Sequence, residues 1–184
     1  MNSPLPPGSL VEITGPCSSG RTALLHSILA SATARGETCA IVDCTNAFDP
    51  ASAAASGADL ERLLWVQAGG RMDRALKAAD LILHGGGFGV VVLDLCDIAP
   101  NQLLRIPLSY WYRFRLVVEK TPATFVVAGA RPIAKSCAAL QLESKRKRTL
   151  WSGQAPFRLL AGAEFEIASR KPGHVEPALL RAAV

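Results

Sequence analysis

Residues 15–22 are Gly15-Pro16-Cys17-Ser18-Ser19-Gly20-Arg21-Thr22. They follow a short apolar run at residues 10–14 and precede a segment in which apolar residues recur at helical spacing until Gly36. The spacing is that of G-x-x-x-x-G-[K]-[ST], with an arginine in the lysine position. Backbone N–H groups of such a loop, backed by a helix N-terminus, can hold phosphate oxygens. The pattern predicts a strand, a phosphate-binding loop and a helix.

The arginine leaves the chemistry of this loop open. The residues expected to contact phosphate are Gly15, Pro16, Ser18, Ser19, Gly20, Arg21 and Thr22. A lysine ammonium reaches phosphates as a point charge, whereas a guanidinium is larger, planar and always charged, so Arg21 binds the phosphates, blocks the pocket or points away. The Thr22 hydroxyl can ligate Mg²⁺. A glycine-containing strand-to-helix turn without a ligand has the same spacing.

Apolar runs alternate with amphipathic segments through residues 8–130. Further strands are predicted at residues 39–42, 63–66, 90–93 and 124–128; helices are predicted at residues 72–83 and 104–120, with a small-residue helix ending near Gly57. Residues 90–93 are continuously apolar and β-branched or leucine, which is typical of a strand covered on both faces. The alternation indicates right-handed crossovers and an α/β fold with a mostly parallel sheet flanked by helices.

The pattern changes beyond residue 138. Short strand-like pieces at residues 139–142, 150–151, 157–161 and 164–168 suggest antiparallel hairpins that extend the sheet. After Pro172-Gly173 we expect a loose tail or a short helix. We therefore expect a single domain over residues 1–184, with a core at 8–130, a sheet extension with a basic loop at 131–170, and a tail at 171–184. A chain of 184 residues that is 49% hydrophobic can bury such a core.

Composition sets further expectations. No apolar stretch is long enough to span a membrane and the N-terminus lacks a signal-peptide pattern, so we expect a cytoplasmic protein without a membrane partner. Five cysteines without C-x-x-C spacing are expected to be reduced and mostly buried. The net charge of +5 suits an anionic partner but is also common in proteins that bind no nucleic acid.

Asp94 ends the apolar strand at residues 90–93 and is an acidic residue of the kind that the Mg²⁺ side of a phosphate-loop site requires. Two candidate strands separate the loop from Asp94. Residues 15–22 resemble the loop of the RecA recombinases, which is G-P-E-S-S-G-K-T. Residues 41–43, 47–50, 57–60, 63–67 and 91–94 also resemble successive RecA segments, so the resemblance covers residues 8–130. It implies ATP with Mg²⁺ as cofactor, with Asp49 near adenine and with Thr22 and Asp94 at the metal.

Three departures from RecA concern the reaction itself. The water-activating glutamate of RecA corresponds to Thr45, which cannot act as a carboxylate base. The tyrosine that stacks on adenine corresponds to Ser52, and the glutamine that senses the γ-phosphate falls near Gly129 or Ala130. The loss of these three groups favours a degenerate ATPase site. Such a site either binds ATP without efficient hydrolysis or binds no nucleotide.

A core of this size, with Leu64-Trp65-Val66, Arg131-Pro132, residues 136–140 and Trp151, resembles the ImuA family, which is also grouped with SulA-like proteins. That resemblance implies an accessory role in SOS-induced mutagenic repair (translesion synthesis), with an ImuB-like Y-family polymerase homologue as partner and DNA or a RecA filament as further candidates. Two alternatives stay open. One is a working ATPase in which Asp43 or Asp97 positions water; the other is a SulA-like inhibitor of cell division.

Two surface features point to partners. The run Lys145-Arg146-Lys147-Arg148 could neutralise several DNA phosphates, and a solvated hairpin turn explains it equally well. Tyr110, Trp111, Tyr112 and Phe114 cannot all face one side of a helix, so one or two should be exposed. An exposed aromatic residue there is consistent with a protein partner or with cover from a neighbouring loop.

Overall fold

The computed structural model describes residues 5–154, 156–170 and 178–183. Its centre is one eight-stranded sheet with the strand order β3-β2-β4-β5-β1-β6-β7-β8. The strands are β1 Ser9–Thr14, β2 Cys39–Asp43, β3 Leu63–Gln67, β4 Val90–Asp94, β5 Thr124–Gly129, β6 Leu140–Ser152, β7 Leu159–Ser169 and β8 Ala178–Ala183. All pairings from β3 to β6 are parallel, and β7 and β8 are added antiparallel. The predicted mostly parallel sheet with an antiparallel extension is confirmed.

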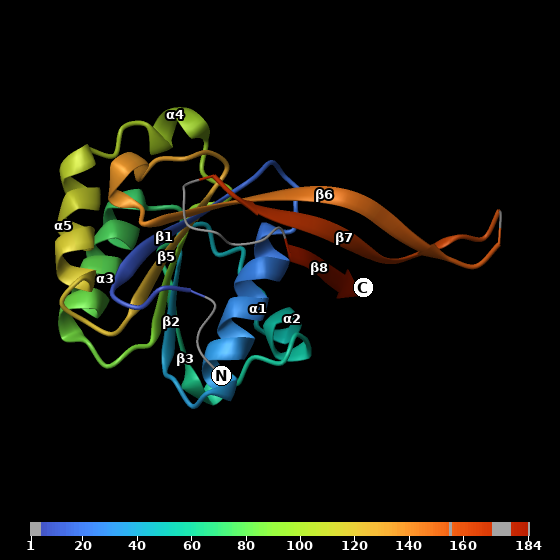
Figure 1. Ribbon diagram of the computed structural model, residues 1–184, viewed down its shortest axis with the longest axis horizontal. Coiled ribbons are helices and arrows are strands. Elements are labelled where there is room, and N and C mark those ends of the chain that lie inside the picture. Colours follow the sequence, from blue (N-terminus) through green and yellow to red (C-terminus); the bar gives the residue numbers. More distant parts are fainter. Residues whose placement is uncertain (1–4, 155, 171–177, 184) are drawn as a thin grey trace.

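Helices cover both faces of the parallel part (Figure 1). They are α1 Arg21–Ala34, α2 Pro50–Ala55, α3 Met72–Gly85, α4 Pro100–Leu103 and α5 Leu108–Val118, with short 3₁₀ turns at Leu60–Arg62 and Lys135–Cys137. One apolar core lies between the sheet and α3 and α5, and a second lies between the sheet and α1 and α2. Strand β4 serves both, because Val91 and Leu93 enter the first core while Val90 and Val92 enter the second. Residues 90–93 are all apolar because both faces of this strand are covered by the two cores.

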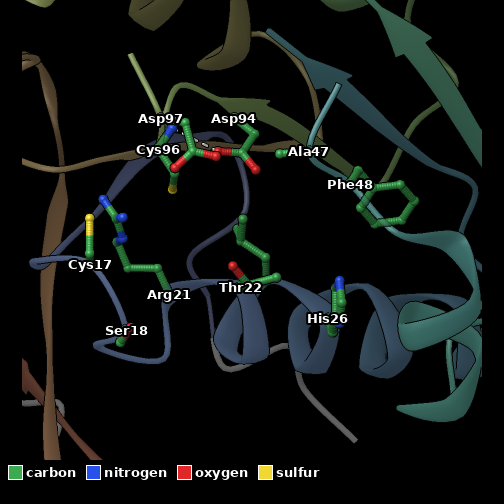
Figure 2. A pocket seen from close by; sticks show the side chains of 11 residues that line it. Cys17, Ser18, Arg21, Thr22, His26, Ala47, Phe48, Asp94, Cys96 and Asp97 are labelled. Carbon is green, nitrogen blue, oxygen red and sulfur yellow. Dashed lines mark hydrogen bonds between the residues drawn. The ribbon is translucent and has the colours of Figure 1, made fainter. Parts of the chain in front are cut away.

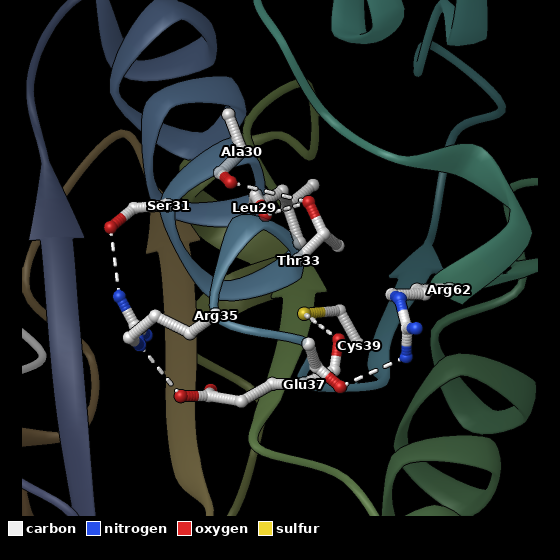
Figure 3. A network of polar contacts seen from close by, with 9 residues as sticks. Leu29, Ala30, Ser31, Thr33, Arg35, Glu37, Cys39 and Arg62 are labelled. Carbon is white, nitrogen blue, oxygen red and sulfur yellow. Dashed lines mark hydrogen bonds and ion pairs between the residues drawn. The ribbon is translucent and has the colours of Figure 1, made fainter.

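Polar contacts close the connection from α1 to β2 (Figure 3). The Arg35 guanidinium donates to Glu37 Oε1 at 2.7 Å and to Ser31 Oγ at 2.8 Å, and Arg62 donates to the Gly36 carbonyl at 3.0 Å. Gly36 has a φ of 84°, a left-handed conformation that glycine adopts without steric cost. The helix therefore ends where the sequence predicted, and β2 starts in register beside β4.

A buried carboxylate holds the segment after β5. Glu12, in the middle of β1, is 1% exposed. It accepts hydrogen bonds from the backbone N–H groups of Ile133 and Ala134 and from the Gln141 side chain. Three donors satisfy the carboxyl oxygens, which offsets the cost of burying this polar group.

The predicted helix at residues 104–120 is wrong at its start. The structure has a short α4, then a turn, then α5 from Leu108. Pro107 lies at the N-cap of α5 because proline lacks the N–H that a continuing helix would require. The predicted exposure of one or two aromatic residues is confirmed, since Tyr112 is 46% exposed whereas Trp111 and Phe114 are buried.

The C-terminal prediction is also corrected. The four short strand-like pieces are two long strands, β6 and β7, whose hairpin extends away from the helices (Figure 1). Backbone pairing continues through the charged residues because both faces of a ribbon outside the core can be polar. Residues 178–183, expected in a loose tail or short helix, form β8; Pro172 and Gly173 lie outside the described residues.

Candidate functional site

The loop between β1 and α1 needs glycine at two positions. A Cβ on Gly15 would lie 2.4 Å from the Ser144 carbonyl oxygen, and one on Gly20 would lie 2.4 Å from the Phe165 ring. Gly20 also has a φ of 89°, and Ser18 shares this left-handed conformation at 58°. Both predicted glycines are therefore required by close contact with β6 and β7.

The same two strands form the back wall of the loop. The Ser144 hydroxyl, on β6, donates to the Ser19 carbonyl at 2.6 Å in a fully buried contact. Phe165, on β7, is 7% exposed and packs on Gly20. Any movement of the loop must therefore disturb the base of the β6–β7 hairpin.

Arg21 is buried although it is the first residue of α1. Its side chain is 6% exposed, and its Nη1 atom has no hydrogen-bond partner among the described residues. The Ser19 Oγ atom is equally buried and also unpartnered there. Unpartnered buried donors are costly, and at a helix N-terminus they are arranged to receive an anion. The buried Arg21 Nη1 at the start of α1, which lines a cavity, is therefore a candidate donor to an anion.

Beside Arg21 lies a pocket of about 150 Å³ (Figure 2). Its lining residues are Cys17, Ser18, Arg21, Thr22, Leu25, His26, Ala47, Phe48, Asp94, Cys96 and Asp97. Figure 2 shows the Arg21 guanidinium extending past Cys17 toward Cys96, with Thr22 and Asp94 further along the same cavity. The structure thus brings together Ser18, Arg21, Thr22 and Asp94 from the predicted set. Gly15, Pro16, Ser19 and Gly20 belong to the same loop without lining the cavity.

Asp94 ends β4 at the pocket wall. Its Oδ1 accepts a hydrogen bond from the Cys96 backbone N–H at 2.9 Å. Burial raises the pKa of Asp94, the Cys96 hydrogen bonds oppose this, and the neighbouring Asp43 and Asp97 raise it further. A raised pKa means that the ionised carboxylate is disfavoured in the folded chain, and the resulting loss of stability grows as the pH rises above 3.8. A cation beside Asp94 would relieve this cost.

Asp43 organises the turn after β2. It is 1% exposed and accepts hydrogen bonds from the backbone N–H groups of Thr45, Ala47 and Phe48 at 3.2, 3.1 and 2.8 Å. The Trp65 indole donates a fourth at 3.3 Å. Because these contacts occupy its oxygens, Asp43 is poorly suited to position water. Asp97, the other carboxylate considered for that role, is exposed and lines the pocket.

Asp49 is placed as a helix cap. It accepts hydrogen bonds from the backbone N–H groups of Ala51 and Ser52 at the start of α2 and lies outside the pocket lining. The Ser52 hydroxyl also donates a hydrogen bond to Asp49. This bond has the largest effect on Asp49, and together with the two backbone hydrogen bonds it lowers the pKa of the carboxyl. Its predicted contact with adenine stays a prediction. At the end of β5, Gly129 offers no side-chain amide for a phosphate.

The outer end of the pocket is aromatic and was not predicted. His26 packs edge-on against Phe48 with ring centroids 5.7 Å apart, and Phe48 packs in the same way against Trp65 at 5.6 Å. Burial lowers the pKa of His26, which Asp49 partly offsets, so the ring is favoured in its neutral form. The signal in the sequence was the spacing, since His26 follows Thr22 by four residues and therefore shares its helix face.

The basic run lies within strand β6 and not in a hairpin turn. All four side chains are exposed. Lys145 pairs with Glu143 at 3.3 Å and Arg148 pairs with Glu164 at 3.2 Å. Arg146 and Lys147 have no carboxylate partner within the described ranges. Lys147 lies at a register shift in the pairing with β7.

The cysteines match the expectation. All five are free, and Cys39, Cys44 and Cys137 are buried. Burial, with Asp43 and Asp94 nearby, raises the pKa of Cys44 to about 11, so its thiol is protonated at neutral pH. Within the described part of the chain no group of three or more histidine, cysteine or carboxylate residues is arranged to hold a metal ion. None of the described helices combines the length and apolarity needed to cross a bilayer.

Comparison with known proteins supports this description. Residues 3–104, more than half of the chain, match the family model of the RecA N-terminal domain. The chain is 41% identical over 90 residues to protein RecA of Teredinibacter turnerae, an alignment that covers 49% of this chain and 26% of that protein. The structure is similar to the crystal structure of the RadB recombinase, with a TM-score of 0.66, 14% identity and coverage of 95% of this chain and 86% of the other. The chain belongs to the RecA N-terminal domain family.

Proposed function

We propose that this protein is a RecA-like accessory factor of SOS-induced mutagenic DNA repair, an adaptor that binds a Y-family polymerase homologue and does not turn over ATP. The observation that carries the proposal is the burial of the Arg21 side chain beside the phosphate loop. The ImuA-like features of the sequence support the pathway, and membership of the RecA family supports a role in repair.

The size of the pocket supports a loss of catalysis. Sites for nucleotide-sized ligands have volumes of about 300–1,000 Å³, whereas the cavity beside Arg21 has about 150 Å³. The buried, unpartnered Arg21 Nη1 suits a phosphate-sized anion. A whole nucleotide requires the guanidinium to move. Thr45 then offers no carboxylate to activate water.

Some of the residues expected to hold a cofactor nevertheless line the pocket. If ATP and Mg²⁺ bind, the loop N–H groups and Arg21 would hold phosphate oxygens, and Thr22 and Asp94 would face the metal. Mg²⁺ at this position would neutralise phosphate charge.

The presence of Asp97 in the lining favours a second candidate function, an ATPase in which Asp97 positions water. Saturable binding of MgATP in calorimetry, with hydrolysis lost in Asp97→Asn, would establish the second function over the first.

The adaptor role is tested by affinity capture. The full chain, immobilised, is expected to retain an ImuB-like Y-family homologue from the same genome, with or without MgATP. The Asp94→Asn variant should retain it equally, because a non-catalytic site does not govern the contact. Retention of the cell-division GTPase in place of the polymerase homologue would favour the SulA-like alternative and overturn the proposal.

We also propose that the hairpin contacts DNA. We define the arm as residues 145–154 and 156–163, which contain five lysines and arginines and no acidic residue. Arg146 and Lys147 are exposed and, unlike the neighbouring Lys145 and Arg148, pair with no carboxylate among the described residues. Each phosphate contact to a single strand contributes about 0.7 to the slope of log K against log salt. The variant R146A/K147A should therefore reduce this slope by roughly 1–1.5 for a dT oligonucleotide, measured by fluorescence anisotropy.

The matched control is R74A/K77A, which removes the same charge from exposed positions of α3. It should leave the slope close to the wild-type value. An equal reduction of the slope in both variants would show that net charge alone governs DNA binding and would contradict a specific role for the arm.

A further inference from the structure

An apolar stripe runs along the outer surface of α5 and the turn before it. Leu104, Leu108, Tyr112 and Leu116 are 71%, 38%, 46% and 58% exposed. Their spacing of four residues keeps successive side chains of α5 on adjoining parts of one face. We call these four residues the α5 stripe. Single exposed apolar residues are common, but a continuous row of four marks an interaction surface.

A hollow lies at each end of the α5 stripe. The first, of about 260 Å³, is bordered by Leu104, Leu108 and Trp111 on one side and by Pro132 and Ile133 on the other. The second, of about 290 Å³, lies between the end of α3 and α5; its lining residues include Leu83, His84, Arg113, Leu116 and Lys120. Hollows flanking a row of apolar residues can receive the anchor side chains of a partner, as in helix-in-groove recognition.

The charged residues that line the two hollows are basic. Arg105 and Lys135 are the charged residues that line the first. Arg113, Lys120 and, when protonated, His84 are those of the second. The carboxylates on this surface are already paired, Asp80 with Arg113 at 3.0 Å and Glu119 with Arg115 at 2.7 Å. The surface is therefore complementary to an acidic partner.

We propose that the α5 stripe is a docking site for an amphipathic helix with acidic flanks, supplied by another protein. A second copy of this chain would place the same basic rim against itself in a two-fold contact, which like-charge repulsion disfavours. The stripe extends about 12 Å from Leu108 to Leu116 at 1.5 Å per residue, and Leu104 adds roughly a further turn. A helix of about three turns matches this length.

The site lies apart from the arm. Figure 1 shows α5 at one end of the molecule and the β6–β7 hairpin extending from the other. The two surfaces can therefore be occupied together. That the partner helix belongs to the polymerase homologue rests on the proposed function; the docking surface itself rests on α5 alone.

The test uses two fluorescein-labelled 18-residue helical peptides with identical leucines at i, i+4, i+7 and i+11, one flanked by glutamate and the other by lysine. Fluorescence anisotropy with the full chain is expected to show at least tenfold tighter binding of the acidic peptide. The variant Y112A/L116A should weaken that binding at least tenfold. The control F157A/L159A removes exposed apolar side chains from the arm and should leave it unchanged.

Equal affinity for both peptides, or insensitivity to Y112A/L116A, would overturn the docking surface. Self-association of the chain that is abolished by Y112A/L116A in sedimentation would assign the stripe to a second copy and also overturn it. Capture of the polymerase homologue is measured in a separate affinity-capture experiment with wild type and Y112A/L116A. If the acidic peptide binds through the stripe and the homologue is not captured, the surface stands and the adaptor function fails. If the homologue is captured but the peptides bind equally or without sensitivity to Y112A/L116A, the adaptor function stands and the docking surface fails.

Discussion

Replacing Arg21 with lysine is expected to increase the affinity of the chain for MgATP at least tenfold, with no gain in hydrolysis. The lysine side chain is smaller than the buried guanidinium and would open the 150 Å³ cavity while keeping a positive charge for the phosphates. A tenfold change corresponds to about 1.4 kcal/mol. Isothermal titration calorimetry would measure the affinity, and release of phosphate would measure the hydrolysis.

The double variant R21K/T45E separates binding from catalysis. A carboxylate at position 45 restores the residue type that activates water in RecA, and a positioned general base typically contributes about 10²- to 10⁴-fold. We expect hydrolysis to rise above background only in the double variant. T45E alone should remain inactive because the Arg21 side chain still restricts the cavity to about 150 Å³. Tight MgATP binding and hydrolysis by the wild-type chain, lost in R21K, would instead show that the arginine is a working substitute.

Removing the Glu12 side chain is expected to destabilise the fold by about 3–5 kcal/mol. The E12A change would leave the buried N–H groups of Ile133 and Ala134 without their acceptor and would remove one of the two acceptors of the Gln141 amide. Each unsatisfied buried donor costs about 1–3 kcal/mol. Urea unfolding followed by circular dichroism would measure the free energy of unfolding.

Two controls define the cause of this effect. E12Q keeps one acceptor oxygen and the side-chain volume, so we expect a smaller loss of about 1–2 kcal/mol. E61A removes an exposed carboxylate from a 3₁₀ turn and should change stability by less than about 0.5 kcal/mol. A loss of less than about 1 kcal/mol in E12A would contradict the structural role of Glu12.

The parallel core was predictable because its signals are local. Continuous apolar runs, helical spacing and glycine stops depend on residues within one turn or strand of each other. The predicted strand at residues 90–93 is β4, extended by Asp94 alone. The ribbon at residues 140–169 was fragmented by the prediction because its charged residues interrupt the alternation that marks a half-buried strand.

The candidate site was predictable only in part. Thr22 and Asp94 were placed at one pocket by the spacing of the loop and by the parallel sheet, in which strand ends share an edge. His26 and Phe48 were missed because aromatic residues at helical or turn positions more often belong to the core. The buried Asp43 was considered as a base, and its four hydrogen bonds show a structural use that its position in the sequence does not reveal.

Local sequence was sufficient for the phosphate loop, for the order of strands in the parallel core, and for the family. The packing of the loop was not, because it depends on groups far along the chain: Ser144 contacts Ser19 across 125 residues, and Phe165 packs on Gly20. The same is true of Glu12, whose donors lie more than 120 residues away. Burial and hydrogen-bond satisfaction are properties of such long-range contacts. The residues of the phosphate loop could therefore be recognised in the sequence, whereas the position of the loop depends on how strands β6 and β7 pack against Ser19 and Gly20.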